Sequence, residues 1–185
     1  MFDLPVVLPV VAALIHGVSF VLYNVDTRFG KTKPNVVSWG LWAFSSTLGA
    51  LTFRAINDTV AALQFTTGSI GCITTFVFSL LIGRFAWPTR RQWYVIAIGL
   101  ISIIVWKLSG PLAANMVLAF VSAWSFWPSI KDAWEDPYTN KRTRSWILWT
   151  TSTSITLVNT YLHKGGMSLN LVMPIVLILG HGVVA

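Results

Sequence analysis

The sequence predicts an all-α integral membrane protein, and three of its features point to that class. Hydrophobic residues make up 55% of the 185 residues and charged residues only 10%, whereas a soluble domain is nearer one quarter charged. Long uncharged apolar runs recur, each close to the roughly 20 residues that a helix needs to cross a bilayer. Helices are expected rather than strands, because the runs are continuous and an open strand in lipid would leave its backbone groups unpaired.

The first half of the chain contains three apolar runs, at residues 5–24, 35–53 and 59–83. No basic residue precedes the first run, so we expect it to be retained as a helix rather than cleaved as a signal peptide. A basic loop that includes Asp26 follows it and ends at Pro34, a natural position for a helix to begin. All six acidic residues, Asp26 among them, are assigned to termini or loops.

Four further runs follow, at residues 92–106, 108–130, 145–162 and 167–185. A basic turn with Pro88 as helix breaker precedes the first of these runs. The longest polar loop, residues 131–144, separates the second of them from the third. Pro174 is expected to interrupt the last run. The sequence therefore predicts seven transmembrane helices.

The basic residues predict how these helices are oriented in the membrane. Ten of the thirteen Lys and Arg residues fall in the loops after the first, third and fifth runs, and three fall on the other side. Because cytoplasmic loops carry an excess of Lys and Arg, we expect the N-terminus outside and the C-terminus in the cytoplasm. The formal charge of +7 follows from these loops, so a nucleic-acid partner is not expected.

A short motif occurs twice and indicates an internal repeat. Residues 38–42 read SWGLW and residues 145–149 read SWILW, and each copy follows a basic polar loop and opens an uncharged run. A Ser-Phe pair precedes each copy, by 19 residues at Ser19 and by 20 residues at Ser125. Self-similarity at a fixed spacing is the sequence signature of an architecture built from repeated units.

The repeat predicts a 3+1+3 arrangement of the seven helices. Residues 1–83 form one three-helix unit and residues 108–185 the other, with a linker helix in residues 84–107. Because the linker crosses the membrane once, both units have the same orientation, as in the parallel repeats of some transporters. A weaker match between the third and seventh runs, 106 residues apart, pairs Gln64 with Asn170.

This arrangement, with an outside N-terminus, resembles the SWEET and PQ-loop superfamily of seven-helix membrane transporters. Members carry a Pro-Gln-like pair near the end of each unit's first helix, then a basic loop, then a Ser and a Trp that open the second helix. Here Pro128 and Ser129 precede the second motif, with Ser129 where Gln is expected, and Val21-Leu22 replaces the pair in the first unit. The resemblance implies facilitated transport of a small neutral, sugar-like solute.

The resemblance also implies that Trp and Asn residues of both units line the solute pocket. Trp42 and Trp149 lie one turn inside their helices and are candidates to stack on the solute, with packing or lipid contact as the alternative. Gln64 and Asn170 are candidates to hydrogen-bond it, although an amide in hydrocarbon also serves as a contact between helices.

Residues at helix ends and bends complete the predicted path. Trp39 and Trp146 open the second and sixth runs, where indole rings commonly act as interfacial anchors. Three prolines are expected to act as bending points or hinges: Pro34, Pro128 and Pro174.

Two histidines fall within apolar runs, where ionisable residues are rare and default to a functional interpretation. His16 lies in the middle of the first run and His181 late in the seventh. Either imidazole could ligate haem or a chlorophyll-type pigment, but no pair has metal-ligand spacing within one helix, and the sequence otherwise implies no cofactor and no metal. With no carboxylate inside a run for proton coupling, any movement of solute is expected to be uncoupled.

A second interpretation stays open: a non-transporting structural or accessory subunit packed on a larger membrane complex, with pigment or haem at the histidines. The near absence of soluble mass and the abundance of Trp and Phe, 10 and 11 residues, suit such a role. The expected partners are thus the lipid bilayer and either a small neutral solute, further copies of the chain or a larger complex.

The chain has no phosphate-binding loop, CxxC or HExxH motif, so an enzyme is not expected.

Overall fold

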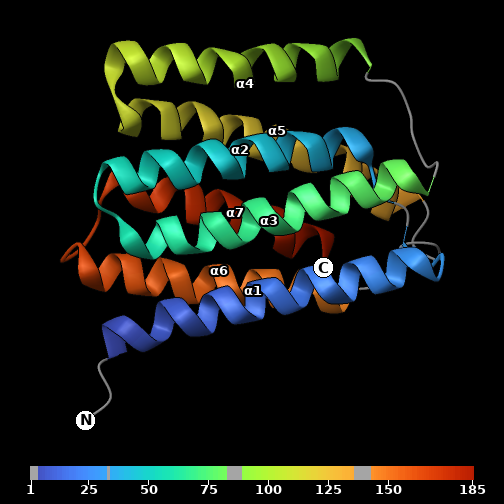
Figure 1. The fold of residues 1–185 in the computed structure, drawn as a ribbon, viewed down its shortest axis with the longest axis horizontal. Coiled ribbons are helices and arrows are strands. Elements are labelled where there is room, and N and C mark those ends of the chain that lie inside the picture. The colour runs from blue at the N-terminus through green and yellow to red at the C-terminus, as the bar shows by residue number, and fades with distance from the viewer. Residues whose placement is uncertain (1–3, 33, 83–88, 136–142) are drawn as a thin grey trace.

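The computed structural model describes residues 4–32, 34–82, 89–135 and 143–185. Over these residues the chain forms seven α-helices and one short 3-10 helix, without strands. The helices lie side by side, roughly along the longest axis of the molecule (Figure 1). Five of them, α1 to α5, are long and apolar enough to cross a membrane, so the chain is a helical, multi-pass membrane protein.

The first three helices are α1 (Leu4–Arg28), α2 (Val36–Ala55) and α3 (Thr59–Leu81). Side chains cap two of them. The Asn35 side chain accepts a hydrogen bond from the backbone N–H of Ser38 at 3.1 Å, and Asp58 accepts one from Ala61 at 3.1 Å. These caps satisfy donors that have no partner inside the helix, so they explain where α2 and α3 begin.

Three acidic residues, Asp26, Asp132 and Glu135, lie inside helices and not in the loops where the sequence interpretation put them. Asp26 lies inside the last turn of α1, not in a loop, because the helix continues four residues past the predicted end at residue 24. Its side chain is fully buried. The expectation that every acidic residue falls in a terminus or loop is therefore wrong for Asp26, Asp132 and Glu135.

The remaining elements are α4 (Arg90–Ser109), α5 (Pro111–Glu135), α6 (Thr143–His163), η1 (Leu169–Leu171) and α7 (Val172–Val184). A capping box between Thr89 and Gln92 begins α4. Pro128 lies inside α5, which continues to Glu135. Pro174 lies in the first turn of α7, where a proline is tolerated because the N–H it lacks would have no helical partner. The expected interruption of the last run therefore lies before α7, at η1, rather than at Pro174.

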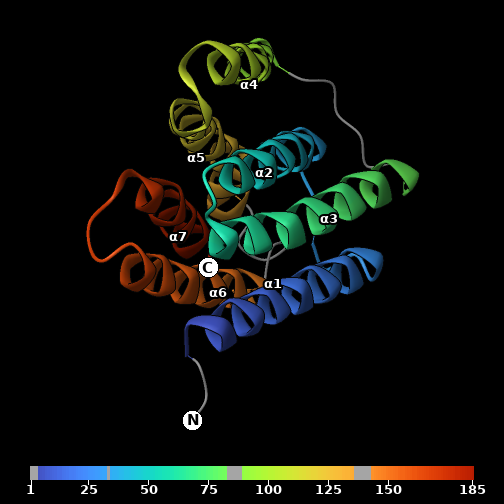
Figure 2. The same ribbon diagram turned by 60° about the vertical axis from the view of Figure 1, so that its left-hand side comes forward.

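Helix packing follows one order in both halves of the chain (Figures 1 and 2). α3 lies between α1 and α2, whose backbones do not pack on each other, and α7 lies in the same way between α5 and α6. Across the halves, α1 packs on α6 and α2 packs on α5. α4 packs on α5 and touches α2 lightly, so it lies at the edge of the bundle. In Figure 1 the odd-numbered helices run one way and the even-numbered helices the other.

α6 differs from the other long helices because most of its buried residues, apart from Trp146 and Trp149, are polar. It is not among the five apolar spans, and its buried polar residues are Ser145, Ser152, Thr153, Thr156, Asn159 and Thr160. Several of its hydroxyls bond the preceding turn, as Thr153 does to the Trp149 carbonyl at 2.8 Å, which lowers the cost of burying them. The helix turns this face toward α1 and α7, its neighbours in the bundle.

Candidate functional site

A small cavity of about 40 Å³ lies where the two halves of the chain meet. Such a volume holds a few water molecules. Its lining comes from α1, α2, α3, α5, α6 and α7, and comprises His16, Phe20, Trp39, Trp42, Ser45, Ser46, Phe65, Cys72, Ser122, Phe126, Trp146, Trp149, Leu177 and His181. The structure thus brings together four residues that the sequence singled out separately: Trp42, Trp149, His16 and His181.

Aromatic rings form two equivalent contacts between the halves. The ring centroids of Phe20 on α1 and Trp149 on α6 are 5.1 Å apart, and those of Phe126 on α5 and Trp42 on α2 are 4.9 Å apart. Both distances fall in the range of favourable aromatic pairs. Phe20 and Phe126 belong to the two Ser-Phe pairs, and the two tryptophans belong to the two SWxLW motifs. Corresponding residues therefore make corresponding contacts.

The first tryptophan of each motif extends the same pattern. Trp39 lies 5.1 Å from Trp42 and 5.8 Å from Trp149, while Trp146 lies 5.0 Å from Trp149 and 6.2 Å from Trp42, centroid to centroid. Only 3% of Trp39 and 6% of Trp146 is exposed. The expectation that these two indoles are interfacial anchors is wrong, because each packs inside the protein against the partner motif.

Two glycines let the phenyl rings approach the middle helix of each half. A Cβ atom added at Gly71 on α3 would overlap the ring of Phe20, and one added at Gly180 on α7 would overlap the ring of Phe126. Sequence reasoning paired the third and seventh runs through Gln64 and Asn170, 106 residues apart. Gly71 and Gly180 lie 109 residues apart, and each makes the same contact with the phenyl ring of a Ser-Phe pair. The pairing of Gln64 with Asn170 stays a prediction.

Two further lining residues follow these glycines directly. Cys72 follows Gly71 and His181 follows Gly180. Both side chains are buried and both line the cavity. A thiol in one half thus occupies the position that an imidazole occupies in the other, so the polar lining is unequal in the two halves.

Polar contacts between the halves also occur in equivalent pairs. His16 Nδ1 on α1 lies 3.2 Å from Ser152 Oγ on α6, and Ser122 Oγ on α5 lies 3.4 Å from Ser45 Oγ on α2. The Ser152 hydroxyl donates to the Ala12 carbonyl at 2.8 Å. Its oxygen then accepts from His16, which favours the tautomer with the proton on Nδ1. Nε2 of His16 is left as an acceptor beside the cavity.

Three buried polar atoms of the lining have no hydrogen-bond partner within the described residues. They are Nε1 of Trp42, Nε1 of Trp149 and Nδ1 of His181. An indole N–H is a donor only, and a buried donor without a partner costs about 1–3 kcal/mol. A ligand or water that offers oxygen acceptors would satisfy both indoles.

The two amides that the sequence assigned to solute binding do not line this cavity. Gln64 Nε2 on α3 donates to Thr153 Oγ1 on α6 at 3.1 Å. Asn170 Nδ2, in η1, donates to Asp58 Oδ2 at 2.8 Å. Each amide joins elements of the two halves, which is the ordinary use of an amide among membrane helices. Gln64 and Asn170 are therefore left out of the proposed solute path.

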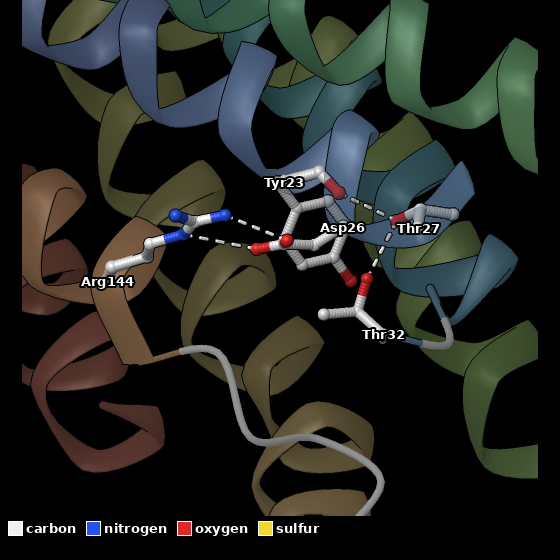
Figure 3. A network of polar contacts seen from close by, with 5 residues as sticks. All are labelled: Tyr23, Asp26, Thr27, Thr32 and Arg144. Atoms are coloured by element: carbon white, nitrogen blue, oxygen red, sulfur yellow. Dashed lines mark hydrogen bonds and ion pairs between the residues drawn. The ribbon is translucent and has the colours of Figure 1, made fainter. Parts of the chain in front are cut away.

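Ion pairs join the two halves at both ends of the bundle. At one end Arg144 Nη2, at the start of α6, lies 2.8 Å from Asp26 Oδ1 on α1 (Figure 3). At the other end Lys164 Nζ lies 3.9 Å from Asp58 Oδ2. Sequence reasoning missed both pairs, since it assigned these carboxylates to loops without a partner. The cavity lies between two charged contacts that close the interface.

The predicted hinge prolines lie apart from the cavity. Pro34 is buried just before the Asn35 cap of α2, and Pro174 is buried in the first turn of α7. Pro128 lies within α5, in the part of the helix that leads to its end at Glu135. Their role as bending points stays a prediction.

The two histidines that the sequence singled out as possible pigment ligands share one site. His16 and His181 both face the 40 Å³ cavity, which in this closed form is smaller than a porphyrin or chlorin ring. Ligation of haem or a pigment by either histidine stays a prediction.

Comparison with known proteins identifies no relative: no protein-family model, no curated protein and no solved structure matches this chain. The cavity, its lining and the contacts around it therefore carry the functional argument.

Proposed function

We propose that the chain consists of two parallel three-helix repeats, residues 1–83 and 108–185, joined by a linker helix in residues 84–107. We propose further that the interface between the repeats is a path for facilitated transport of a small neutral solute. The observation that carries both statements is the pairing of corresponding residues across the interface. Phe20 meets Trp149 as Phe126 meets Trp42.

Helix packing supports the repeat. Each proposed unit places its third helix between its first and second, and the first helix of each unit packs on the second helix of the other. α1 and α5 run in the same direction (Figure 1), as a single linker crossing requires. Seven membrane crossings, α6 and α7 included, with N-terminus outside and C-terminus in the cytoplasm are part of this proposal.

The chemistry of the lining supports a neutral solute with oxygen acceptors. No Lys, Arg, Asp or Glu lines the cavity, so a charged solute would lack a counter-charge. Indole N–H groups of Trp42 and Trp149 are without partners in the described residues, and hydroxyl or carbonyl oxygens would accept from them. Flat indole faces also suit the apolar face of a sugar-like ring. Trp42 and Trp149 are therefore the proposed solute contacts.

The size of the cavity supports a closed conformation. A volume of about 40 Å³ is too small for a sugar, so the interface must open before a solute can enter. Asp26 with Arg144 holds one end, and Asp58 with Lys164 holds the other. In the proposed cycle these pairs open in turn, which exposes the cavity to one side of the membrane at a time.

The test is uptake of labelled sugars and small neutral metabolites into proteoliposomes, without an imposed ion gradient. Saturable equilibration of one solute, inhibited by excess unlabelled solute, is the expected result. Folded protein that moves none of the panel would overturn the transport proposal. Leakage of all solutes at equal, non-saturable rates would likewise count against a binding site at Trp42 and Trp149.

One observation favours a second candidate, a non-transporting subunit of a larger membrane complex. The outer faces of α4 and α5 expose four large indoles, Trp93, Trp124, Trp127 and Trp134, and α4 is the least covered of the five apolar spans. Exposed aromatic surface is enriched at protein interfaces. Stable co-purification of other membrane chains with this protein, lost when Trp93 and Trp124 are changed to Leu, would support that role over transport.

A further inference from the structure

A second and larger pocket, about 470 Å³, opens between α2, α4 and α5. It lies away from the cavity between the repeats, at the end of the bundle where α2 and α4 begin. Its lining comprises Asn35, Val37, Ser38, Leu41, Thr89, Arg90, Gln92, Val95, Trp124, Ser125, Trp127, Pro128 and Lys131. We propose that this pocket binds the phosphate-bearing headgroup of an anionic membrane lipid.

Two cationic side chains supply the charge for such a ligand. Arg90 begins α4 and Lys131 lies near the end of α5, so they reach the pocket from different helices. Lys131 Nζ lies 3.6 Å from Oε1 of Glu135, which follows one helical turn later, and both side chains are exposed. An exposed pair of this kind contributes little, so Lys131 can exchange that contact for a phosphate. Arg90 adds a planar donor that suits phosphate oxygens.

Two helix N-termini strengthen the positive field at the same pocket. α2 begins after Asn35 and α4 after Thr89, and both capping residues line the pocket. A helix N-terminus carries partial positive charge and backbone N–H groups that stabilise anions. Two such ends on one pocket, together with two basic side chains, make an anion the matching ligand.

A buried hydroxyl points independently to a polar ligand. Ser38 lines the pocket and is only 1% exposed, yet its Oγ has no partner within the described residues. Its backbone N–H is already used by the Asn35 cap. Buried hydroxyls are normally hydrogen-bonded, and a phosphate oxygen in the pocket would accept from Ser38 Oγ.

The surroundings favour a lipid as the source of the phosphate. Trp124 and Trp127 line the pocket and are 44% and 57% exposed. Indoles are enriched at the depth of lipid headgroups, and basic pockets between membrane helices on the cytoplasmic side bind anionic headgroups. The apolar outer faces of α4 and α5 offer acyl chains a continuous surface, which a free phosphate ion would not use.

Binding is measured by native mass spectrometry of the full chain in mild detergent, titrated with phosphatidylglycerol or with phosphatidylcholine. The first variant is Arg90→Gln/Lys131→Gln. Its control is Arg54→Gln/Lys107→Gln, which removes the same charge from exposed residues at the opposite end. We expect preferential binding of phosphatidylglycerol, weakened roughly 10- to 30-fold by the first variant and unchanged by the control. Equal affinity for both lipids, or equal loss in both variants, would overturn the proposal.

Two further arms separate the alternatives. Inorganic phosphate is added as a competitor; displacement of the lipid at micromolar phosphate would identify a free anion site and overturn the lipid assignment. Ser38→Ala is compared with Ser145→Ala, the equivalent buried hydroxyl of the second motif, which also lacks a partner in the described residues but does not line this pocket. Only Ser38→Ala is expected to weaken phosphatidylglycerol binding, by about 3- to 10-fold.

Discussion

Arg144 and Asp26 lie 118 residues apart and meet through two hydrogen bonds, from Nη2 to Oδ1 at 2.8 Å and from Nε to Oδ2 at 3.3 Å. Asp26 is fully buried, whereas about half of the Arg144 side chain is exposed. The neighbouring Thr27 hydroxyl donates to the Tyr23 carbonyl at 2.9 Å and lies 2.8 Å from Thr32 Oγ1 (Figure 3). The end of α1 is thus held in one conformation while it holds the start of α6.

Removal of Arg144 should destabilise the protein. Arg144→Gln leaves the Asp26 carboxylate buried and without its charge partner, at an expected cost of about 2–4 kcal/mol, less than for a fully buried pair because Arg144 is half exposed. Arg144→Gln/Asp26→Asn should recover part of that loss. Thermal unfolding in detergent measures both. An unchanged unfolding midpoint in Arg144→Gln would show that the pair does not hold the repeats together.

The same variant should change transport. If the pair closes one end of the path, Arg144→Gln opens that end more often and raises the rate of solute exchange while the solute specificity stays. Lys164→Gln makes the same change at the opposite ion pair, where the contact with Asp58 is longer, at 3.9 Å. It is the comparison variant for Arg144→Gln. A slower rate in Arg144→Gln, from protein of normal fold, would contradict the closing role.

The two glycines beneath the phenyl rings should be intolerant of a methyl group. Gly71→Ala and Gly180→Ala each force Phe20 or Phe126 out of place, at an expected cost of about 1–3 kcal/mol. Gly182→Ala is the control, since nothing lies within 4 Å of the position its Cβ would occupy. Unfolding midpoints report the difference, and Phe20→Leu should rescue Gly71→Ala. Equal midpoints for all three alanine variants would refute the overlap.

Loss of an indole N–H should weaken solute binding without collapse of the core. Trp149→Phe and Trp42→Phe keep an aromatic ring in the cluster, whereas an alanine at either position would leave a cavity that costs about 3–5 kcal/mol. Each phenylalanine variant is expected to raise the half-saturating solute concentration by roughly tenfold, the equivalent of one hydrogen bond. Transport kinetics in proteoliposomes provide the measurement. Retention of normal half-saturation in both variants would remove these residues from the path.

The equivalent serines should differ in their contribution to stability. Ser152 bonds both the Ala12 carbonyl at 2.8 Å and His16 at 3.2 Å, while the contacts of Ser45 with the Trp42 carbonyl and Ser122 are 3.3 and 3.4 Å. Ser152→Ala is therefore expected to cost about 1–3 kcal/mol, and Ser45→Ala less than 1 kcal/mol. Thermal unfolding of the two variants, measured side by side, compares their losses of stability. A larger loss in Ser45→Ala than in Ser152→Ala would contradict the prediction.

Helix positions were largely predictable because hydropathy is a local property. Continuous apolar runs located α1 to α5, although α1 and α5 extend beyond the predicted ends at residues 24 and 130. Asp26 shows why the ends were less certain. A charged residue ordinarily ends an apolar run, but here Arg144, remote in sequence, neutralises it and lets the helix continue.

The role of individual polar and aromatic residues was less accessible. The sequence located Trp39 and Trp146 at helix starts, and only the packing of one motif against the other turned them inward. Gln64 and Asn170 were two amides in comparable runs, yet each bonds a different neighbour. A local pattern does not say which helix lies opposite, so it cannot assign a buried side chain to a cavity or to a contact.

By itself, the sequence determined that the chain is helical and apolar enough for a membrane, that SWxLW and Ser-Phe occur twice, and that His16, His181, Trp42 and Trp149 are unusual. Those properties follow from composition and from spacing along one chain. Only the tertiary structure decided that these residues share one cavity, that Phe20 and Phe126 pack over Gly71 and Gly180, and that ion pairs of the buried carboxylates Asp26 and Asp58 join the two halves at both ends. The reason is that each of these depends on contacts between residues about 50 to 120 positions apart in the chain, which the order of residues in any one helix does not encode.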